Sequence, residues 1–291
     1  MTLSELRSSL RNVSIIARLT LREAARRRLL WVLVGLTAVI VALTWWAFGR
    51  VAEATPVTGP LQTLGYSQVT VMLAFMFSFV LAMTAVFAGS PAIGADIESG
   101  LLLAVLARPI RRSEVLLGRW LGLALVLVVY ALIAGYLELA AVILATGYAP
   151  RDPLAGPIYL AGESLVLLTL AIVVSTRVSS VAGGAVAVVA FGLAWMAGVL
   201  GGLGSAFAND VLHDVGTVSR LLLPSDVLWR GAAGSLSPDD SILNAGGVNA
   251  YLYKFSPFSG AAPSLTWLAW CAIWIVGMLA IGILLLRRRE L

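Results

Sequence analysis

Charged residues gather in one interruption between two long apolar stretches of this 291-residue chain. The carboxylates Asp96 and Glu98 come first, and a short apolar run separates them from a basic cluster. That cluster consists of Arg108, Arg111, Arg112 and Arg119. Charges of both signs beside an apolar knob can form ion pairs with a soluble partner and fill an apolar cleft on it. The segment is therefore predicted to be a docking surface, and the alternative is a solvated loop that only fixes topology.

Two further carboxylates, Glu138 and Glu163, fall inside apolar stretches. Carboxylates within a membrane are costly and usually face the interior of a helix bundle. Both are expected near the outer ends of adjacent spans, where they could lie close together. They could attract a cationic substrate, or one could stay protonated. The alternative is a carboxylate that reaches the outer interface or bonds a neighbouring helix, and this alternative is preferred for Glu163.

Several chemistries are excluded by residues that the chain lacks. A phosphate-binding loop of the G-x-x-x-x-G-K-[ST] type needs its lysine, and the single lysine here is Lys254, in YLYKFSP. The single histidine, His213, excludes a His-pair metal site. Asp210 and Asp214 flank it at helical spacing, but a polar surface is the preferred interpretation, and no metal site is predicted. The lone Cys271 excludes an intramolecular disulfide.

Composition indicates which elements must position these residues. The chain is 60% hydrophobic and 12% charged, whereas soluble domains carry about 25% charged residues. Backbone groups in lipid must be hydrogen-bonded internally, and stretches of ~20 apolar residues fit spanning helices. The sequence therefore predicts an all-α polytopic membrane protein. Its six predicted spans are 29–48, 69–89, 119–146, 159–176, 181–203 and 264–286.

Basic residues set the predicted orientation. With those spans, 15 of the 20 lysines and arginines fall on one side of the membrane. The positive-inside rule places that side in the cytoplasm, with both termini and a predicted loop over 90–118. The segment 204–262 is then external. A nucleic-acid partner is not expected, because the basic residues belong to no folded domain outside the membrane.

The first 28 residues show an amphipathic pattern. Apolar residues recur at helical spacing, while arginines share another face of the same helix. The apolar set is Leu3, Leu6, Leu10, Val13 and Ala17, and the basic set is Arg7, Arg11, Arg18 and Arg22. This pattern predicts a helix lying in the inner membrane interface. The alternative is basic charge that only sets topology.

The second span carries a stripe of methionine and phenylalanine at helical spacing. The stripe includes Phe75, Met76, Phe79, Met83 and Phe87. Such side chains make an adaptable surface for varied apolar ligands. Lipid contact or ordinary helix packing explains the same stripe, so both interpretations stay open.

The fifth span and the segment after it carry two packing signals. Ala194, Gly198 and Gly202 lie four residues apart, which lets another helix approach closely, either from this chain or from a second copy. Residues 218–236 mix leucine, tryptophan and arginine, which predicts a short helix at the outer interface. Ser225 or Asp226 could cap its start.

The order of these parts resembles a known family. The resemblance is carried by LTLREAARRRLLWVLVGL (19–36) before the first span and by GADIESGLLLAVLARPIRRSEVLLGRWLG (94–122) after the second. Together they resemble the ABC-2 type permeases, the membrane subunits of type-2 ABC exporters. The family's acidic-Gly element, leucines and R-P-x-x-R segment correspond to Glu98, Gly100, Leu101 to Leu103, Arg108, Pro109 and Arg112, followed by Gly118 and Arg119. LLLPSDVLWRG (221–231) is also similar to bacterial members, including the permease of nitrous-oxide-reductase maturation systems.

The resemblance implies partners and a location. Two permease subunits, as a homodimer or with a homologous permease, pair with two copies of a separate ATPase subunit in the bacterial plasma (inner) membrane, in contact with membrane lipid. ATP and Mg would bind on the ATPase subunit, so this chain would hold no cofactor and would not be an enzyme by itself.

The resemblance also implies roles for individual residues. The loop would carry a coupling helix that docks on the ATPase, with Asp96, Glu98, Gly100, Leu101, Leu102, Arg108, Pro109, Arg111 and Arg112. Residues 1–28 would be the connecting helix, with Arg18, Arg22 and Arg26, and 29–291 the transmembrane domain. Spans two and five would flank the substrate path, which assigns to it Phe75, Met76, Phe79, Met83, Phe87, Trp195 and Met196, with Glu138 nearby.

Three functions fit these observations. The first is export of a hydrophobic or amphipathic compound such as a drug, lipid or glycolipid. The second is a permease of a maturation or force-transmitting system, with an external protein docked on 204–262. The third is a membrane sensor or assembly factor that transports nothing.

Overall fold

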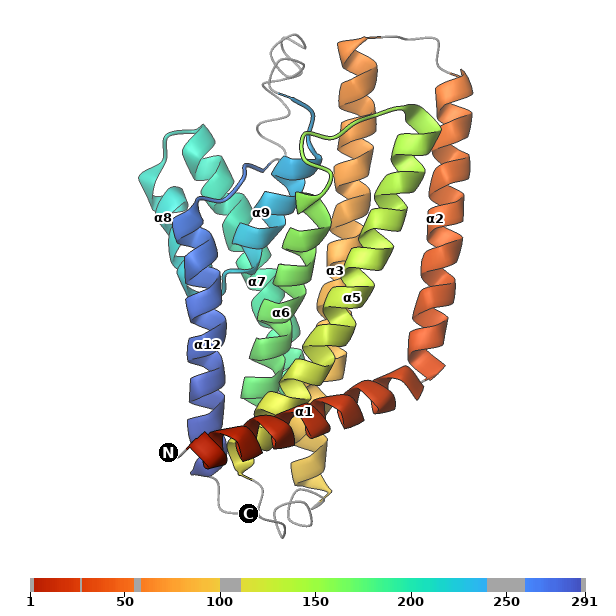
Figure 1. The fold of residues 1–291 in the computed structure, drawn as a ribbon. Helices are drawn as coiled ribbons and strands as arrows, with labels where there is room; N and C mark the ends of the chain where they lie inside the picture. Colours follow the sequence, from red (N-terminus) through yellow and green to blue (C-terminus); the bar gives the residue numbers. More distant parts are fainter. Residues whose placement is uncertain (1–2, 27, 55–58, 100–110, 240–259, 289–291) are drawn as a thin grey trace.

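The computed structural model describes residues 3–26, 28–54, 59–99, 111–239 and 260–288 (Figure 1). Every regular element in these ranges is a helix. Six of the helices are long and apolar enough to cross a membrane, which confirms the predicted all-α polytopic fold. They are α2 (Arg28–Ala54), α3 (Pro60–Glu98), α5 (Arg112–Thr146), α6 (Ala155–Ser175), α7 (Ser180–Ala206) and α12 (Leu265–Arg287).

Two of these helices extend well beyond the apolar stretches that predict them. Helix α3 has 39 residues, or about 58 Å at 1.5 Å per residue, whereas the hydrocarbon core is ~30 Å thick. It continues through Glu98, and α5 already begins at Arg112. Both ends of the predicted 90–118 loop are therefore helical. Hydropathy identifies only the part of a helix at membrane depth, so it does not detect polar helical end turns such as Ala95–Glu98.

Helix α1 (Leu3–Arg26) crosses one end of the bundle at a steep angle to the spans (Figure 1). We call this end, where α3 finishes and α5 begins, the α1 end. Helix α1 packs against α5. A Cβ atom at Gly118 would lie 2.6 Å from the Cβ of Ile16, and one at Gly122 would lie 2.8 Å from the carbonyl oxygen of Ala17. These two glycines therefore let the backbones of α1 and α5 approach closely.

This contact changes the predicted role of the amphipathic face of α1. Asn12 donates a hydrogen bond from Nδ2 to Oε2 of Glu114 on α5, at 2.9 Å. Val13 and Ala17, predicted to face the acyl chains, instead lie on the side that meets α5. Leu10 and Leu19 stay exposed, at 62% and 59%. The apolar residues of α1 thus serve both a protein contact and an outer surface.

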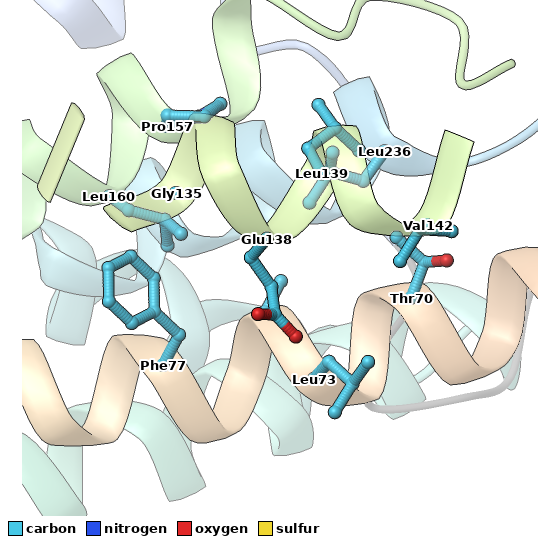
Figure 2. A pocket seen from close by; sticks show the side chains of 11 residues that line it. Thr70, Leu73, Phe77, Gly135, Glu138, Leu139, Val142, Pro157, Leu160 and Leu236 are labelled. Atoms are coloured by element: carbon cyan, nitrogen blue, oxygen red, sulfur yellow. The ribbon is translucent and has the colours of Figure 1, made fainter. Parts of the chain in front are cut away.

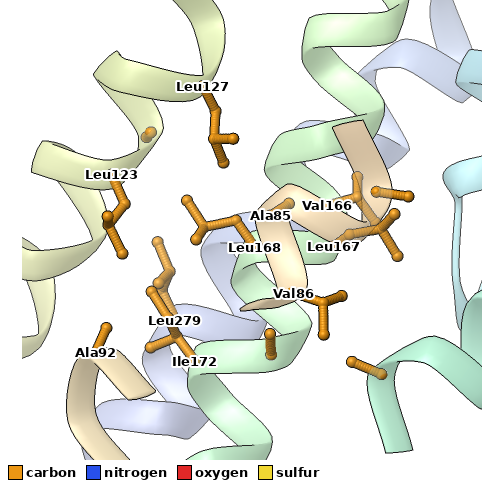
Figure 3. Packing of buried hydrophobic residues seen from close by; sticks show 14 of the residues in the cluster. Ala85, Val86, Ala92, Leu123, Leu127, Val166, Leu167, Leu168, Ile172 and Leu279 are labelled. Carbon is orange, nitrogen blue, oxygen red and sulfur yellow. The ribbon is translucent and has the colours of Figure 1, made fainter. Parts of the chain in front are cut away.

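Helix α6 forms the centre of the bundle, in contact with α3, α5, α7 and α12. Its Leu167, Leu168 and Ile172 are fully buried. Figure 3 shows them packed with Val86 of α3 and Leu279 of α12. A spanning helix surrounded by protein on most sides needs no separate polar face, and the polar side chains that α6 carries, such as Glu163 and Thr169, are buried.

Two short helices follow α7, and the second of them enters the bundle. They are α8 (Asp210–Leu222) and α9 (Ser225–Leu236). Helix α8 packs along α7, α9 packs against α6, and all residues of α9 except Arg230 are buried. The predicted surface helix over 218–236 is therefore wrong for Ser225–Leu236, which is buried, whereas Val218, Leu221 and Leu222 of α8 are exposed. Neither Ser225 nor Asp226 caps α9, because its first flanking residue is Pro224 and no side chain caps it.

A buried ion cluster permits this insertion. Asp226 is 4% exposed, and its Oδ2 accepts hydrogen bonds from Nε of Arg220 at 2.8 Å and from Nε of Arg230 at 2.9 Å. Arg230 also donates to the carbonyl oxygen of Gly198 on α7. The sequence alone assigns these three charged residues to an aqueous surface. Inside the protein their charges are compensated, because one carboxylate binds both arginines and Arg230 forms a further hydrogen bond.

The small-residue face of α7 meets this hairpin. A Cβ atom at Gly198 would overlap the Asp226 carboxylate, and one at Gly201 would lie 2.7 Å from the Cα of Gly216 on α8. The close approach predicted for this face is thus made within the chain. At the hairpin's turn, Trp274 of α12 donates from Nε1 to the carbonyl oxygen of Leu222 at 2.8 Å. This bond satisfies a backbone group well inside a spanning helix's length.

Replacement of Asp226 by Asn should destabilise the hairpin. The change removes the negative charge between two partly buried arginines, and removing one partner of a buried pair typically costs about 3–5 kcal/mol. We expect a clearly lower Tm of the purified chain in detergent. Glu53→Gln, which alters the exposed Arg50–Glu53 pair (3.3 Å), is the control and should leave Tm unchanged. Equal Tm values for the two variants would show that the cluster contributes no stability.

Candidate functional site at the α1 end

An ion cluster joins three helices at the α1 end. Arg119 of α5 forms an ion pair with Asp96 in the last turns of α3, and its Nη1 lies 3.2 Å from Oε2 of Glu23 on α1. The side chains of Arg119 and Asp96 are only 20% and 19% exposed. Asp96, predicted to meet a soluble partner, therefore faces largely inward and fixes α3 to α5.

Glu98 joins α3 to α7. Its Oε1 accepts a hydrogen bond from the backbone N–H of Ser180 at 2.6 Å, and its Oε2 accepts one from the Ser180 hydroxyl at 3.3 Å. Ser180 is the first residue of α7, where unpaired N–H groups and the helix dipole favour a carboxylate. Gly94 allows this approach, since a Cβ there would lie 3.1 Å from the Cα of Ser180. Sequence reasoning missed this link between the second and fifth spans.

The basic residues that open α5 contact the end of the last span. Nη1 of Arg112 donates to the carbonyl oxygens of Leu286 and Arg287, at 2.8 and 3.4 Å. Arg111 is exposed, and its backbone N–H donates to Glu114. Basic groups at a helix C-terminus satisfy its orphan carbonyls. Arg112 thus closes the bundle between α5 and α12 at the same end.

The remaining predicted docking residues are only partly described. Gly100, Leu101, Leu102, Arg108 and Pro109 lie outside the described residues, so their docking role stays a prediction. On α1, Arg18 and Arg22 are exposed. Arg26 is the last residue of that helix, and its side chain lies outside the description.

The aromatic stripe of α3 divides between two environments. Phe75 packs against Trp195 of α7 and Trp229 of α9, with ring centroids 5.3 Å apart in both pairs. It is therefore part of a packed aromatic cluster. Met76 and Met196 are exposed, at 48% and 58%. Helices α3 and α7 are in contact, and the substrate path between spans two and five stays a prediction.

The other half of the stripe lines a cavity that the sequence does not predict. The cavity holds about 670 Å³ and is bounded by α1, α2, α3 and α5. Phe79, Met83 and Phe87 form its α3 wall, while no α7 residue lines it. Its charged lining residues are Glu23, Asp96 and Arg119, the ion cluster of the α1 end.

The two intramembrane carboxylates have separate partners. Glu138 accepts from Thr44 of α2 at 2.6 Å, and Glu163, only 2% exposed, accepts from Ser78 of α3 at 2.7 Å. Glu163 therefore bonds a neighbouring helix and does not reach the interface. Figure 2 shows Glu138 in a pocket with Phe77 and Leu160. At about 30 Å³ this pocket admits water but not an organic cation.

The polar start of α8 is exposed. Nδ1 of His213 lies 3.7 Å from a carboxylate oxygen of Asp214, and both side chains are more than half exposed. Within the described ranges, no three His, Cys, Asp or Glu side chains gather closely enough to hold a metal ion. The geometry here is that of a polar surface.

Comparison with known families agrees with this architecture. The model of the ABC-2 family transporter proteins matches residues 14–291, nearly the whole chain. The chain belongs to the ABC-2 family. No curated protein matches it. ABC-2 permeases are multi-pass membrane subunits of transporters and are not catalytic themselves. The resemblance carried by 19–36 and 94–122 is thereby confirmed at the level of the family.

The close contact between α1 and α5 explains why a glycine stands at position 118, and a substitution can test this. Gly118→Val would force α1 away from α5, because the new Cβ would lie 2.6 Å from the Cβ of Ile16. We expect faster tryptic cleavage at the arginines of α1 and a loss of stability of about 1–3 kcal/mol.

Gly35→Val on α2 is the matched control, since a Cβ there meets nothing within 4 Å. It should leave the cleavage rate of α1 unchanged. If both variants are cleaved like the unaltered chain, the close contact between α1 and α5 does not hold α1 in place.

Proposed function

We propose that this chain is the permease subunit of an ATP-driven exporter that moves a hydrophobic or amphipathic compound, such as a drug, lipid or glycolipid. Membership of the ABC-2 family supports a transporter subunit. The energy must come from another chain, because the single lysine, Lys254, does not belong to a phosphate-binding loop. In the proposed complex, two ATPase subunits bind ATP and Mg beneath two permease subunits.

The observation that carries the proposal is the convergence of four helices at the α1 end. Asp96, Arg119 and Glu23 tie α3 to α5 and α1, and Glu98 ties α3 to α7. The predicted coupling loop, 90–118, includes the end of α3 and the start of α5, both of which are at this end. By the positive-inside rule we assign this end, with exposed Arg18, Arg22 and Arg111, to the cytoplasm. A partner that docks there acts on every helix of the cluster.

The bonds of Glu98 suggest how docking is transmitted. Glu98 is itself exposed, although it binds the first residue of α7. An ATPase surface with a basic or N–H donor would compete with Ser180 for this carboxylate. Docking would then shift the balance between a state with α3 and α7 tied together and a state with them released. In a dimer of permeases, the movement of α3 relative to α7 would open and close the path.

The first test is association with an ATPase. The chain should co-purify with an ATPase encoded beside it, and apolar compounds should stimulate ATP hydrolysis by the complex in lipid vesicles. The permease alone should hydrolyse no ATP. Absence of any ATPase partner would favour a sensor or assembly factor, and a tightly bound external protein without stimulation would favour a maturation system.

The second test is the link between α3 and α7. Glu98→Gln keeps the size of the side chain but weakens its charge-assisted bond to the α7 N-terminus. We expect the ATPase to bind normally and hydrolyse ATP, while the amount of substrate moved per ATP falls severalfold. Glu53→Gln, at the opposite end of the bundle, is the control. Unchanged coupling in Glu98→Gln would refute a role for this bond in transmission.

A further inference from the structure

The lining of the 670 Å³ cavity changes from charged at the α1 end to mainly apolar toward the middle of the bundle. Its charged lining residues lie where α3 ends and α5 begins, and its apolar wall continues toward the middle of the bundle. On α3 the wall runs from Asp96 to Phe79, 17 residues apart, or about 25 Å at 1.5 Å per residue. One leaflet with its headgroups is about 20 Å thick. The cavity is therefore as deep as one leaflet.

The far end of the cavity is closed by a hydrogen bond. Thr37 of α2 and Tyr130 of α5 bond through their hydroxyl groups at 2.7 Å. Thr37 follows the lining residue Leu36, and Tyr130 lies one turn beyond the lining residue Leu127. The bond thus joins α2 to α5 just past the apolar end. A molecule in the cavity would have its polar part at the α1 end and its apolar part beneath this bond.

The charged end offers partners of both signs. The Arg119 guanidinium has five N–H donors, and its bonds to Glu23 and Asp96 occupy one on each terminal nitrogen. Further donors remain for a phosphate, which arginine binds well. The carboxylate of Asp96 can accept additional hydrogen bonds, as an ammonium group would donate. Among the described lining residues, an anionic headgroup without an ammonium would instead meet two carboxylates beside one arginine.

We propose that this cavity binds one zwitterionic phospholipid from the leaflet at the α1 end. Its phosphate lies at Arg119, its ammonium lies at Asp96, and one acyl chain lies along Phe79, Met83 and Phe87. The volume is that of a site for a single drug-sized ligand, so the second acyl chain stays in the bilayer. The site lies within one chain and requires neither transport nor an ATPase. The lipid would bridge α1, α2, α3 and α5.

Native mass spectrometry of the full-length chain tests this proposal. The chain is purified in detergent with an equimolar mixture of phosphatidylethanolamine, phosphatidylglycerol and diacylglycerol carrying identical acyl chains. We expect one phosphatidylethanolamine per chain to be retained, in about tenfold preference over either competitor, as one good polar contact would give. Equal retention of the three lipids would overturn the proposal, and a preference for phosphatidylglycerol would show an anionic-lipid site instead.

Two variants locate the retained lipid. Met83→Trp fills the cavity without altering a charge, and Met72→Trp makes the same change on the same helix at a position 52% exposed and outside the cavity. Retention should be lost in Met83→Trp and kept in Met72→Trp. Arg119→Gln should remove the preference for phosphatidylethanolamine. If Arg119→Gln does not fold, the two tryptophan variants decide, and equal retention in both would place the lipid elsewhere and refute the site.

Discussion

The ion cluster around Arg119 is the interaction on which the α1 end depends. One guanidinium from α5 holds a carboxylate of α3 and a carboxylate of α1, so three helices share a single cation. The side chains of Arg119 and Asp96 are partly buried, so water and salt screen their attraction less than that of an exposed pair. The cluster also sets the boundary of the cavity, since the same three side chains are the charged members of its described lining. The same three side chains thus hold the helices together and provide the charged groups that a ligand in the cavity would meet.

Hydropathy predicted most of the fold. Runs of ~20 apolar residues are sufficient to identify spanning helices, because lipid leaves the backbone few alternatives. The same signal could not predict where α3 ends and where α5 begins, since polar helical turns outside the hydrocarbon resemble loops. It also placed 218–236 at a surface, because two arginines and an aspartate suggest water. Only the tertiary structure shows that Asp226 binds both arginines within the bundle.

The sequence suggested candidate residues for the site, but not the groups that these residues contact. Asp96 and Glu98 were predicted to dock a soluble partner, and the structure pairs both with groups of this chain. A carboxylate at a helix end has two possible kinds of partner, a neighbouring helix and another protein, and the sequence does not distinguish them. The cavity could not be predicted either. It arises because α1 turns across the bundle, and the spacing of Gly118 and Gly122 is the one sequence signal of that contact.

The bond from Trp274 to the carbonyl oxygen of Leu222 has a consequence for synthesis of the chain. The donor belongs to α12, whereas the acceptor lies at the turn between α8 and α9, 52 residues earlier. The hairpin therefore emerges from the ribosome before the donor that binds the Leu222 carbonyl is made. Until α12 enters the membrane, the turn must keep its carbonyl in contact with water. Insertion of α12 thus supplies the donor for the turn between α8 and α9.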